Sequence, residues 1–230
     1  MFDKTLISIR SGFFSMGSSN RYSWESPRHQ VWINAFEISR TAITRAEYGA
    51  FLQDTQYTEP AGWNEPQFAG ANLPAVGISW FAAVAYCEWK SAVDGRLYRL
   101  PTEAEWEKAC RGGLDGCEYA WGDQPPGEFE YFSGEWNGPR PVGEWRPNGY
   151  GLCNMGDNVH EWCSDWYAPD YYARSPERNP AGPDSGTRRV SRGGSWRHQV
   201  KASRAAHRSS LPPSYAYTDY GFRIVAEIRT

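Results

Sequence analysis

The chain has 230 residues, of which 40% are hydrophobic and 16% aromatic, and its formal net charge is −3. This much apolar surface excludes an unfolded chain, and the mean hydropathy of −0.69 excludes a protein built mainly of membrane-spanning helices. The small net charge provides no global attraction to nucleic acid or to a membrane surface. One domain over residues 1–230 is expected, since single mixed domains reach ~250 residues.

Charge is unevenly distributed along the chain. Residues 1–173 contain 13 Lys and Arg against 23 Asp and Glu, whereas residues 174–208 contain nine Lys and Arg against two acidic residues. Two interpretations stay open. The two parts pack together and neutralise each other, or the basic segment forms a wall that attracts anions.

Strands are predicted at both ends of the chain. They cover residues 6–9, 12–16, 29–36, 186–195 and 221–228. In the third of them Val31 and Ile33 alternate with polar residues, which is the period of a half-buried strand.

Three helices are predicted between these two groups of strands. They begin at Thr44, Ser79 and Thr102. The first and third carry a capping box, because Glu47 and Glu105 follow their N-cap threonines by three residues. The second, over residues 80–93, is apolar on nearly all sides, which predicts deep burial. Gly112 ends the third helix.

The segment 114–187 is rich in Gly, Pro and Trp, and it predicts no helix. An irregular stretch of this length inside a compact domain needs a non-covalent anchor, such as a bound cation. Strands, helices, an irregular stretch and returning strands together indicate an α+β fold.

Five cysteines are scattered along the chain, and no C-x-x-C pair is present. A zinc knuckle or a thioredoxin-type motif is therefore not expected. The first nine residues lack the basic segment and apolar run of a secretory leader. We expect a cytoplasmic protein with reduced thiols and with neither a nucleic-acid nor a membrane partner.

Six short motifs follow one another from Arg99 to Arg223. They are Arg99-Leu100-Pro101-Thr102-Glu103, Tyr119-Ala120-Trp121-Gly122-Asp123, Pro147-Asn148-Gly149-Tyr150-Gly151-Leu152, Asn154-Met155-Gly156-Asp157-Asn158-Val159-His160-Glu161-Trp162, Arg192-Gly193-Gly194-Ser195-Trp196 and Gly221-Phe222-Arg223. With Phe13-Phe14-Ser15-Met16-Gly17, this ordered set resembles the formylglycine-generating enzyme, or sulfatase-modifying factor, family over nearly the whole chain. The resemblance implies a C-type-lectin-like α+β fold with little regular secondary structure.

The resemblance also implies a structural calcium ion. The family pattern Asn-x-x-Gly-x-x-x-Glu provides side-chain and backbone oxygens, the donors that Ca²⁺ accepts together. The corresponding ligands are Asn154, Asp157, Val159 and Glu161. Asp157 replaces the usual glycine, but that position contributes only its carbonyl. The alternative is a turn in which Glu161 pairs with an arginine. A second calcium site of the family needs a longer loop than residues 132–141 and is not expected.

The copper-binding cysteine pair of the family is missing from this chain. The family oxidases carry two thiolates, which Cu(I) prefers, shortly after Arg-Gly-Gly-Ser. Counted without gaps, His198 and Ser203 occupy these positions, and no cysteine follows Cys163. His160 stands where the family has an oxygen-pocket tryptophan, and its partner serine is kept as Ser195. The candidate catalytic residues are therefore His160, Ser195 and His198.

Two histidines at these positions leave three interpretations. His160 and His198, with His207 as a further candidate, bind iron, copper or zinc, or they act in proton transfer or ligand binding. In the third interpretation they are hydrogen-bonded pocket residues without a chemical role. Candidates for binding a peptide or small-molecule ligand, anionic in character, are Arg197, Arg204, Arg208 and Tyr217.

Two functional classes follow from these observations. One is an oxidoreductase-type enzyme with a His-containing, thiolate-free site that acts on a peptide or a small metabolite. The other is a non-catalytic C-type-lectin-like module that binds a ligand or a protein. If the protein is an enzyme, we expect His160 and His198 to converge at the bottom of a cleft. If it is a binding module, we expect them to lie apart, beside an open rim formed by residues 215–220 and the arginines.

Overall fold

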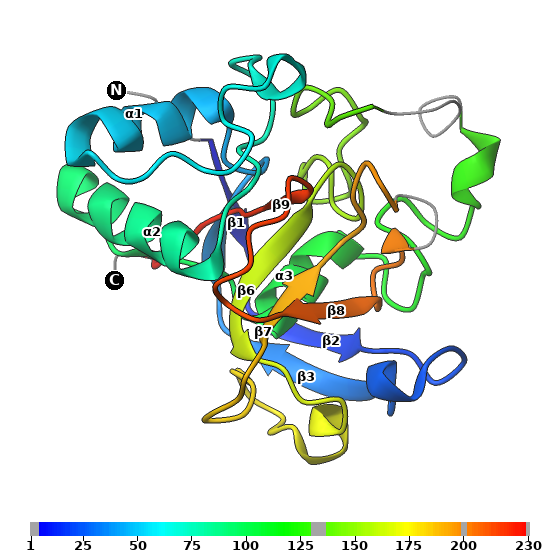
Figure 1. Ribbon diagram of the computed structural model, residues 1–230. Helices are drawn as coiled ribbons and strands as arrows, with labels where there is room; N and C mark the ends of the chain where they lie inside the picture. Colours follow the sequence, from blue (N-terminus) through cyan, green and yellow to red (C-terminus); the bar gives the residue numbers. More distant parts are fainter. Residues whose placement is uncertain (1–4, 130–136, 199–201, 229–230) are drawn as a thin grey trace.

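Three β-sheets and three α-helices form the regular structure of this computed structural model, which describes residues 5–129, 137–198 and 202–228 (Figure 1). The α-helices are α1 (Arg45–Thr55), α2 (Trp80–Asp94) and α3 (Glu103–Arg111). The strands are β1 (Leu6–Ile9), β2 (Gly12–Met16), β3 (His29–Ile33), β4 (Phe36–Ser39), β5 (Tyr98–Arg99), β6 (His160–Trp166), β7 (Arg189–Arg192), β8 (Arg208–Leu211), β9 (Tyr220–Gly221) and β10 (Val225–Ala226). The expected α+β fold is confirmed. Within the described ranges, no helix has the length and apolar character needed to cross a membrane.

Strand pairing joins segments that are far apart in the sequence. The first sheet has the order β1-β4-β10-β5, the second pairs β2 with β3, and the third has the order β8-β7-β6-β9. In the third sheet β6 runs antiparallel to β7 and parallel to β9. His160 therefore lies opposite Tyr220, and Glu161 lies opposite Gly221 on one side and Arg192 on the other.

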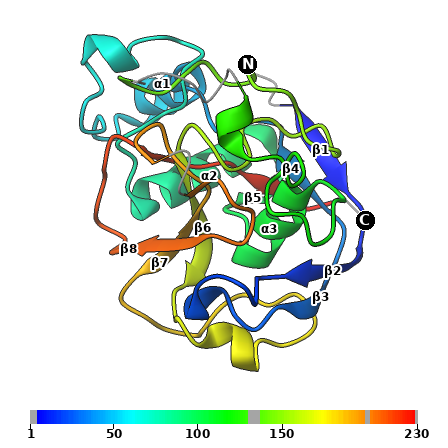
Figure 2. The same cartoon turned by 90° about the vertical axis from the view of Figure 1, so that its right-hand side faces the viewer.

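The helices occupy two different environments. Helices α1 and α2 lie together, away from the β2–β3 ribbon, in both views of the molecule (Figures 1 and 2). Helix α3 instead contacts β2, β3, β6 and β7, and every one of its residues is buried. It is therefore the helix that connects the ribbon to the third sheet.

The predicted helix boundaries are confirmed by their capping interactions. Thr44 Oγ1 accepts a hydrogen bond from the Glu47 backbone N at 3.3 Å, and the Glu47 carboxylate accepts one from the Thr44 backbone N at 2.8 Å. Thr102 and Glu105 form the same reciprocal box at the start of α3. Helix α2 ends at Gly95, whose φ of 61° is a left-handed conformation that glycine adopts without strain.

Two predicted elements differ from the structure. The strand expected over residues 29–36 is divided into β3 and β4, which belong to different sheets, because the Asn34 backbone N donates to the Asn179 side chain instead. The deep burial predicted for α2 is wrong, since Phe81 is 54% exposed and Val93 is 42% exposed. Only one face of this helix packs on the core. The strands expected near the C-terminus are present in shortened form as β7, β9 and β10.

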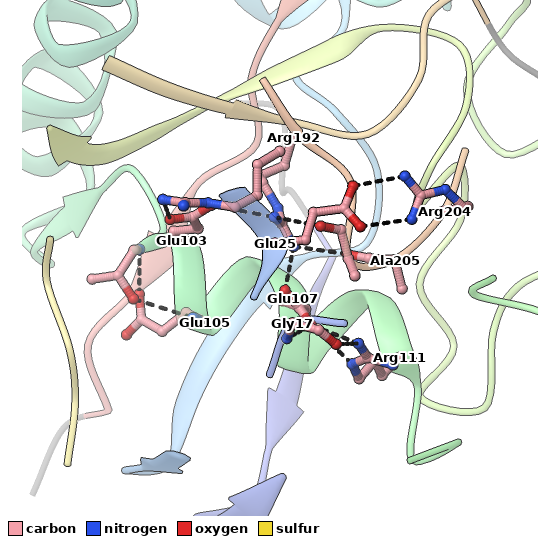
Figure 3. A network of polar contacts seen from close by, with 12 residues as sticks. Gly17, Glu25, Glu103, Glu105, Glu107, Arg111, Arg192, Arg204 and Ala205 are labelled. Atoms are coloured by element: carbon pink, nitrogen blue, oxygen red, sulfur yellow. Dashed lines mark hydrogen bonds and ion pairs between the residues drawn. The ribbon is translucent and has the colours of Figure 1, made fainter. Parts of the chain in front are cut away.

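Buried ion pairs join α3 to the third sheet (Figure 3). Arg192, at the end of β7, is fully buried and contacts both Glu103 and Glu107. Arg208 binds the two carboxylate oxygens of Glu103 at 2.7 and 2.8 Å, and Arg111 binds Glu107 at 2.6 Å. Burial alone would raise the pKa of Glu107, but Arg111 and Arg192 hold it below its ordinary value.

These pairs also explain the uneven charge along the chain. Three arginines of the basic segment bind glutamates of the acidic part: Arg192 binds Glu107, Arg204 binds Glu25 and Arg208 binds Glu103. Neutralisation by packing, the first of the two interpretations, is confirmed for these three side chains.

Replacing Glu107 with Gln should strongly destabilise the protein, because it removes a buried negative charge that Arg111 and Arg192 share. We expect the free energy of unfolding in urea to fall by about 3–5 kcal/mol. The matched control is Glu88→Gln on the exposed surface of α2, which should change it by about 0.5 kcal/mol or less. Equal effects of the two substitutions would contradict this account.

The buried carboxyl group of Asp165 in β6 should make the free energy of unfolding depend on pH. Its buried Oδ2 accepts from the Glu103 backbone N at 2.8 Å, and burial together with the Glu103 charge raises its pKa to about 7. The unfolded chain loses this proton at about pH 4, so between about pH 4 and pH 7 the folded state binds more protons and stability falls as pH rises. Asp165→Asn should remove this dependence. Urea unfolding should show the wild type losing up to about 1.4 kcal/mol per pH unit relative to the variant. A difference that stays constant across this range would refute the assignment.

Candidate functional site

A cleft of about 380 Å³ opens where the starts of β6, β8 and β9 meet the turn that follows β7. Its wall combines charged, polar and aromatic side chains. They include His160, Arg197, His198, His207, Tyr217 and Asp219. This composition, with a few convergent polar groups in a concave site, is typical of a ligand-binding or active site.

His160 is the first residue of β6 and is held by two contacts. Its backbone N donates to the Asp219 carbonyl at 2.9 Å, and its ring Nδ1 lies 2.6 Å from the Gly193 carbonyl. Because a carbonyl can only accept, Nδ1 carries the proton, and the lone pair of the neutral ring is on Nε2. Burial lowers the pKa of His160 to about 4, against the opposing effects of Asp219 and the Gly193 carbonyl. The ring is therefore neutral at pH 7.

Asp219 completes the site, although none of the sequence motifs includes it. It directly precedes β9, so the parallel pairing of β9 with β6 brings it to His160. One donor atom from each of His160, His198 and Asp219 lies within 4.8 Å of the other two. The only signal in the sequence was its place two residues before the Gly221-Phe222-Arg223 motif.

The other two predicted catalytic residues lie on the turn that follows β7. The His198 backbone N donates to the Ser195 carbonyl at 2.8 Å, and the exposed His198 ring has its centroid 6.0 Å from that of His160. Ser195 is fully buried, and its hydroxyl donates to Asp219 Oδ2 at 2.9 Å. The structure thus brings His160 and His198 together, while Ser195 orients the carboxylate of Asp219.

The residues predicted to bind a ligand are divided between two places. Arg197 and Tyr217 line the cleft, where both are exposed. Neither Arg204 nor Arg208 lines the cleft, and Arg204, at the wall of a separate cavity, binds both oxygens of Glu25 at 2.6 and 2.8 Å. A ligand-binding role for these two arginines does not fit this geometry, because buried carboxylates already occupy their guanidinium groups.

His207 and Ser203 differ in their relation to the cleft. His207 lines it, and burial together with the neighbouring Arg204 and Arg192 lowers its pKa to about 3. It lies outside the group of three donor atoms formed by the described residues. Ser203, the second position of the family thiolates, is fully buried.

The residues predicted to bind calcium are all buried, with Asn154, Asp157 and Val159 in the loop before β6 and Glu161 in β6 itself. The Glu161 carboxylate accepts from Arg223 at 2.6 and 2.7 Å and from Trp106 Nε1 at 2.6 Å. Asn154 Oδ1 accepts from the Gly143 backbone N at 2.8 Å. A guanidinium on Glu161 does not fit a divalent cation at the same carboxylate, so the arginine-paired alternative describes this residue. Calcium binding by this loop stays a prediction, and part of the loop 132–141 lies outside the described residues.

The similarity to known proteins extends over nearly the whole chain. The family model described as the sulfatase-modifying factor enzyme 1-like domain matches residues 3–228. The chain is 34% identical to the formylglycine-generating enzyme of Streptomyces coelicolor, over 94% of this chain and 87% of that protein. The structure of PvdO from Pseudomonas aeruginosa superposes with a TM-score of 0.85 at 28% identity, over 97% of this chain and 94% of that one. Treponema denticola variable protein 1 shares the fold, with a TM-score of 0.87 at 24% identity over 98% and 95% of the two chains.

Glu161→Gln should lower the free energy of unfolding by about 3–5 kcal/mol, because it leaves the buried Arg223 without a full negative charge. The arginine-paired alternative predicts that a calcium chelator leaves the melting temperature of the wild type unchanged, because protein groups bind both Glu161 oxygens, whereas a calcium site in this loop predicts a fall. Calorimetry with and without chelator measures both effects. A chelator-dependent fall in the wild type that is absent from the variant would instead establish the calcium site.

Proposed function

The chain belongs to the family of the sulfatase-modifying factor enzyme 1-like domain, and from this premise we propose that it is a divergent, thiolate-free member acting as an oxidoreductase-type enzyme. The substrate is a peptide or a small metabolite, held in the cleft beside His160, His198 and Asp219. Because one fold hosts many activities, the proposal rests on this site and not on the fold.

The observation that supports the proposal is the convergence of His160, His198 and Asp219 in the cleft wall. Neutral His160 has a lone pair on Nε2, which can accept a proton from a bound molecule. Arg197 at the cleft wall provides a positive charge for an anionic part of the substrate. Ser195 holds Asp219 in place through its hydroxyl, so we assign it a positioning role.

The cysteines support a reaction that differs from copper–thiolate oxidation. Four of the five are buried away from the cleft wall: Cys87, Cys110, Cys153 and Cys163. Burial raises the pKa of all four thiols, so at neutral pH they stay protonated and are poor ligands for a metal ion. Cys117 is partly exposed, but it lines a different cavity.

A non-catalytic binding module is the second candidate. The observation that favours it is the pair Tyr215 and Tyr217, each 49% exposed with ring centroids 6.0 Å apart. Exposed tyrosines of this kind provide rigid contact area for a bound partner at a low cost in conformational entropy.

The enzyme and the binding module predict different results when the protein is incubated in air with a mixture of peptides and small metabolites. We expect mass spectrometry to detect a compound that the wild type consumes, at a rate reduced by about 10²–10⁴-fold in His198→Ala. The exposed position of His198 should leave folding intact. The matched control is His29→Gln, which changes a histidine outside the cleft wall and should retain the wild-type rate.

Retention of a compound by the wild type without any chemical change would contradict the enzyme and support the binding module. A cysteine peptide of the kind modified in sulfatases, supplied with Cu(I), should not be converted to formylglycine. Its conversion would show that the thiolate pair is dispensable and would contradict the thiolate-free mechanism.

A further inference from the structure

The cleft contains the donor set of a metal centre, made of two imidazoles and one carboxylate. We propose that His160, His198 and Asp219 together bind one divalent transition-metal ion, which is iron(II) when the protein acts as an oxidoreductase. The inference rests on the cleft being the functional site proposed above. Two histidines and a carboxylate with open positions are typical of non-haem iron(II) centres, and zinc accepts the same donors.

The spacing of the three donor atoms is close to what one ion requires. They lie within 4.8 Å of one another, whereas donors on a single ion at ~2.0–2.2 Å are ~3–3.5 Å apart when adjacent and ~4.4 Å apart when opposite, so ion binding would draw the side chains together. His198 belongs to an exposed turn, so its ring has room to move toward the other two donors. His160 and Asp219 are buried, which makes His198 the donor with the most freedom to adjust.

His160 is already in the protonation state and orientation that a metal ligand needs. Its Nδ1–H donates to the Gly193 carbonyl at 2.6 Å, a contact that metal-bound histidines commonly make through the ring nitrogen that does not hold the ion. This contact fixes the ring and places the lone pair on Nε2.

Asp219 is oriented in the same manner. Its Oδ2 accepts from the Ser195 hydroxyl at 2.9 Å, and its backbone carbonyl accepts from the His160 backbone N at 2.9 Å. A carboxylate held by an outer hydrogen bond is the usual second support of a metal site. Two of the three donors are therefore held by the pairing of β6 with β9 before any ion binds.

A proton relay is the competing explanation for these residues. Such a relay requires the carboxylate to accept the ring N–H of the histidine and so fix its tautomer. Here the ring N–H of His160 goes to Gly193, and the Asp219 carboxylate accepts from Ser195. The remaining lone pairs of His160 and Asp219 are then available to a common partner, which favours an ion over a relay.

Direct metal titration of the full chain tests this inference. The protein is treated with a chelator and dialysed, and it then receives Co²⁺, Zn²⁺ or, without oxygen, Fe²⁺ as the only added ligand. Calorimetry should give one ion per chain, and bound Co²⁺ should show visible absorption that reports its ligands. His198→Ala and Asp219→Asn should weaken binding by more than about 100-fold, and Ser195→Ala by about 10–100-fold. His29→Gln should bind like the wild type.

Two results would overturn the inference: no stoichiometric ion in the wild type, or unchanged affinity in both His198→Ala and Asp219→Asn. Circular dichroism establishes that each variant is folded, and His198→Ala decides the question if the buried Asp219→Asn fails that check. Turnover of the compound by metal-free protein, together with no stoichiometric ion in the titration, would overturn the metal site and leave the proposed enzyme intact. Metal bound with the expected dependence on His198, together with no turnover, would support the site and contradict the proposed enzyme.

Discussion

A buried guanidinium needs negative charge beside it, and Arg192 is the residue most subject to this constraint. It is fully enclosed between Glu103 and Glu107 of α3, and it also donates to the Ala205 carbonyl at 2.7 Å. Any shift of α3 against β7 would leave a charge without its partner in a medium of low dielectric constant, which is strongly unfavourable. These contacts therefore fix the positions of α3, the third sheet and residues 204–208 relative to one another.

The same constraint reaches the cleft through the next residues of the chain. Gly193 follows Arg192 with a φ of 77°, and a Cβ at this position would lie 3.3 Å from the Trp106 ring, so glycine is required there. Its carbonyl receives the ring N–H of His160. The buried ion pairs of Arg192 thus help to position the Gly193 carbonyl. This carbonyl accepts the Nδ1–H of His160 and so leaves the lone pair on Nε2.

Local signals in the sequence predicted the helices and two of the three donor residues in the cleft. Capping boxes depend on residues three apart, so they could be read directly, and ordered motifs marked His160 and His198. Asp219 could not be read in this way, because it meets His160 only through the parallel pairing of two strands 60 residues apart. Arg204 and Arg208 lie close to His198 in sequence, yet distant glutamates determine where their side chains point. The surface position of α2 depends likewise on what packs against it.

The division of the donors between sheet and turn has an evolutionary consequence. His160 begins β6 and Asp219 directly precedes its partner β9, and their backbones are hydrogen-bonded, so a substitution at either disturbs the sheet as well as the cleft. His198 belongs to an exposed turn and can be exchanged with little cost to stability. A single substitution at this position can therefore alter or abolish the chemistry proposed for the cleft while the scaffold is inherited unchanged. The architecture thus leaves the proposed reaction free to change between relatives.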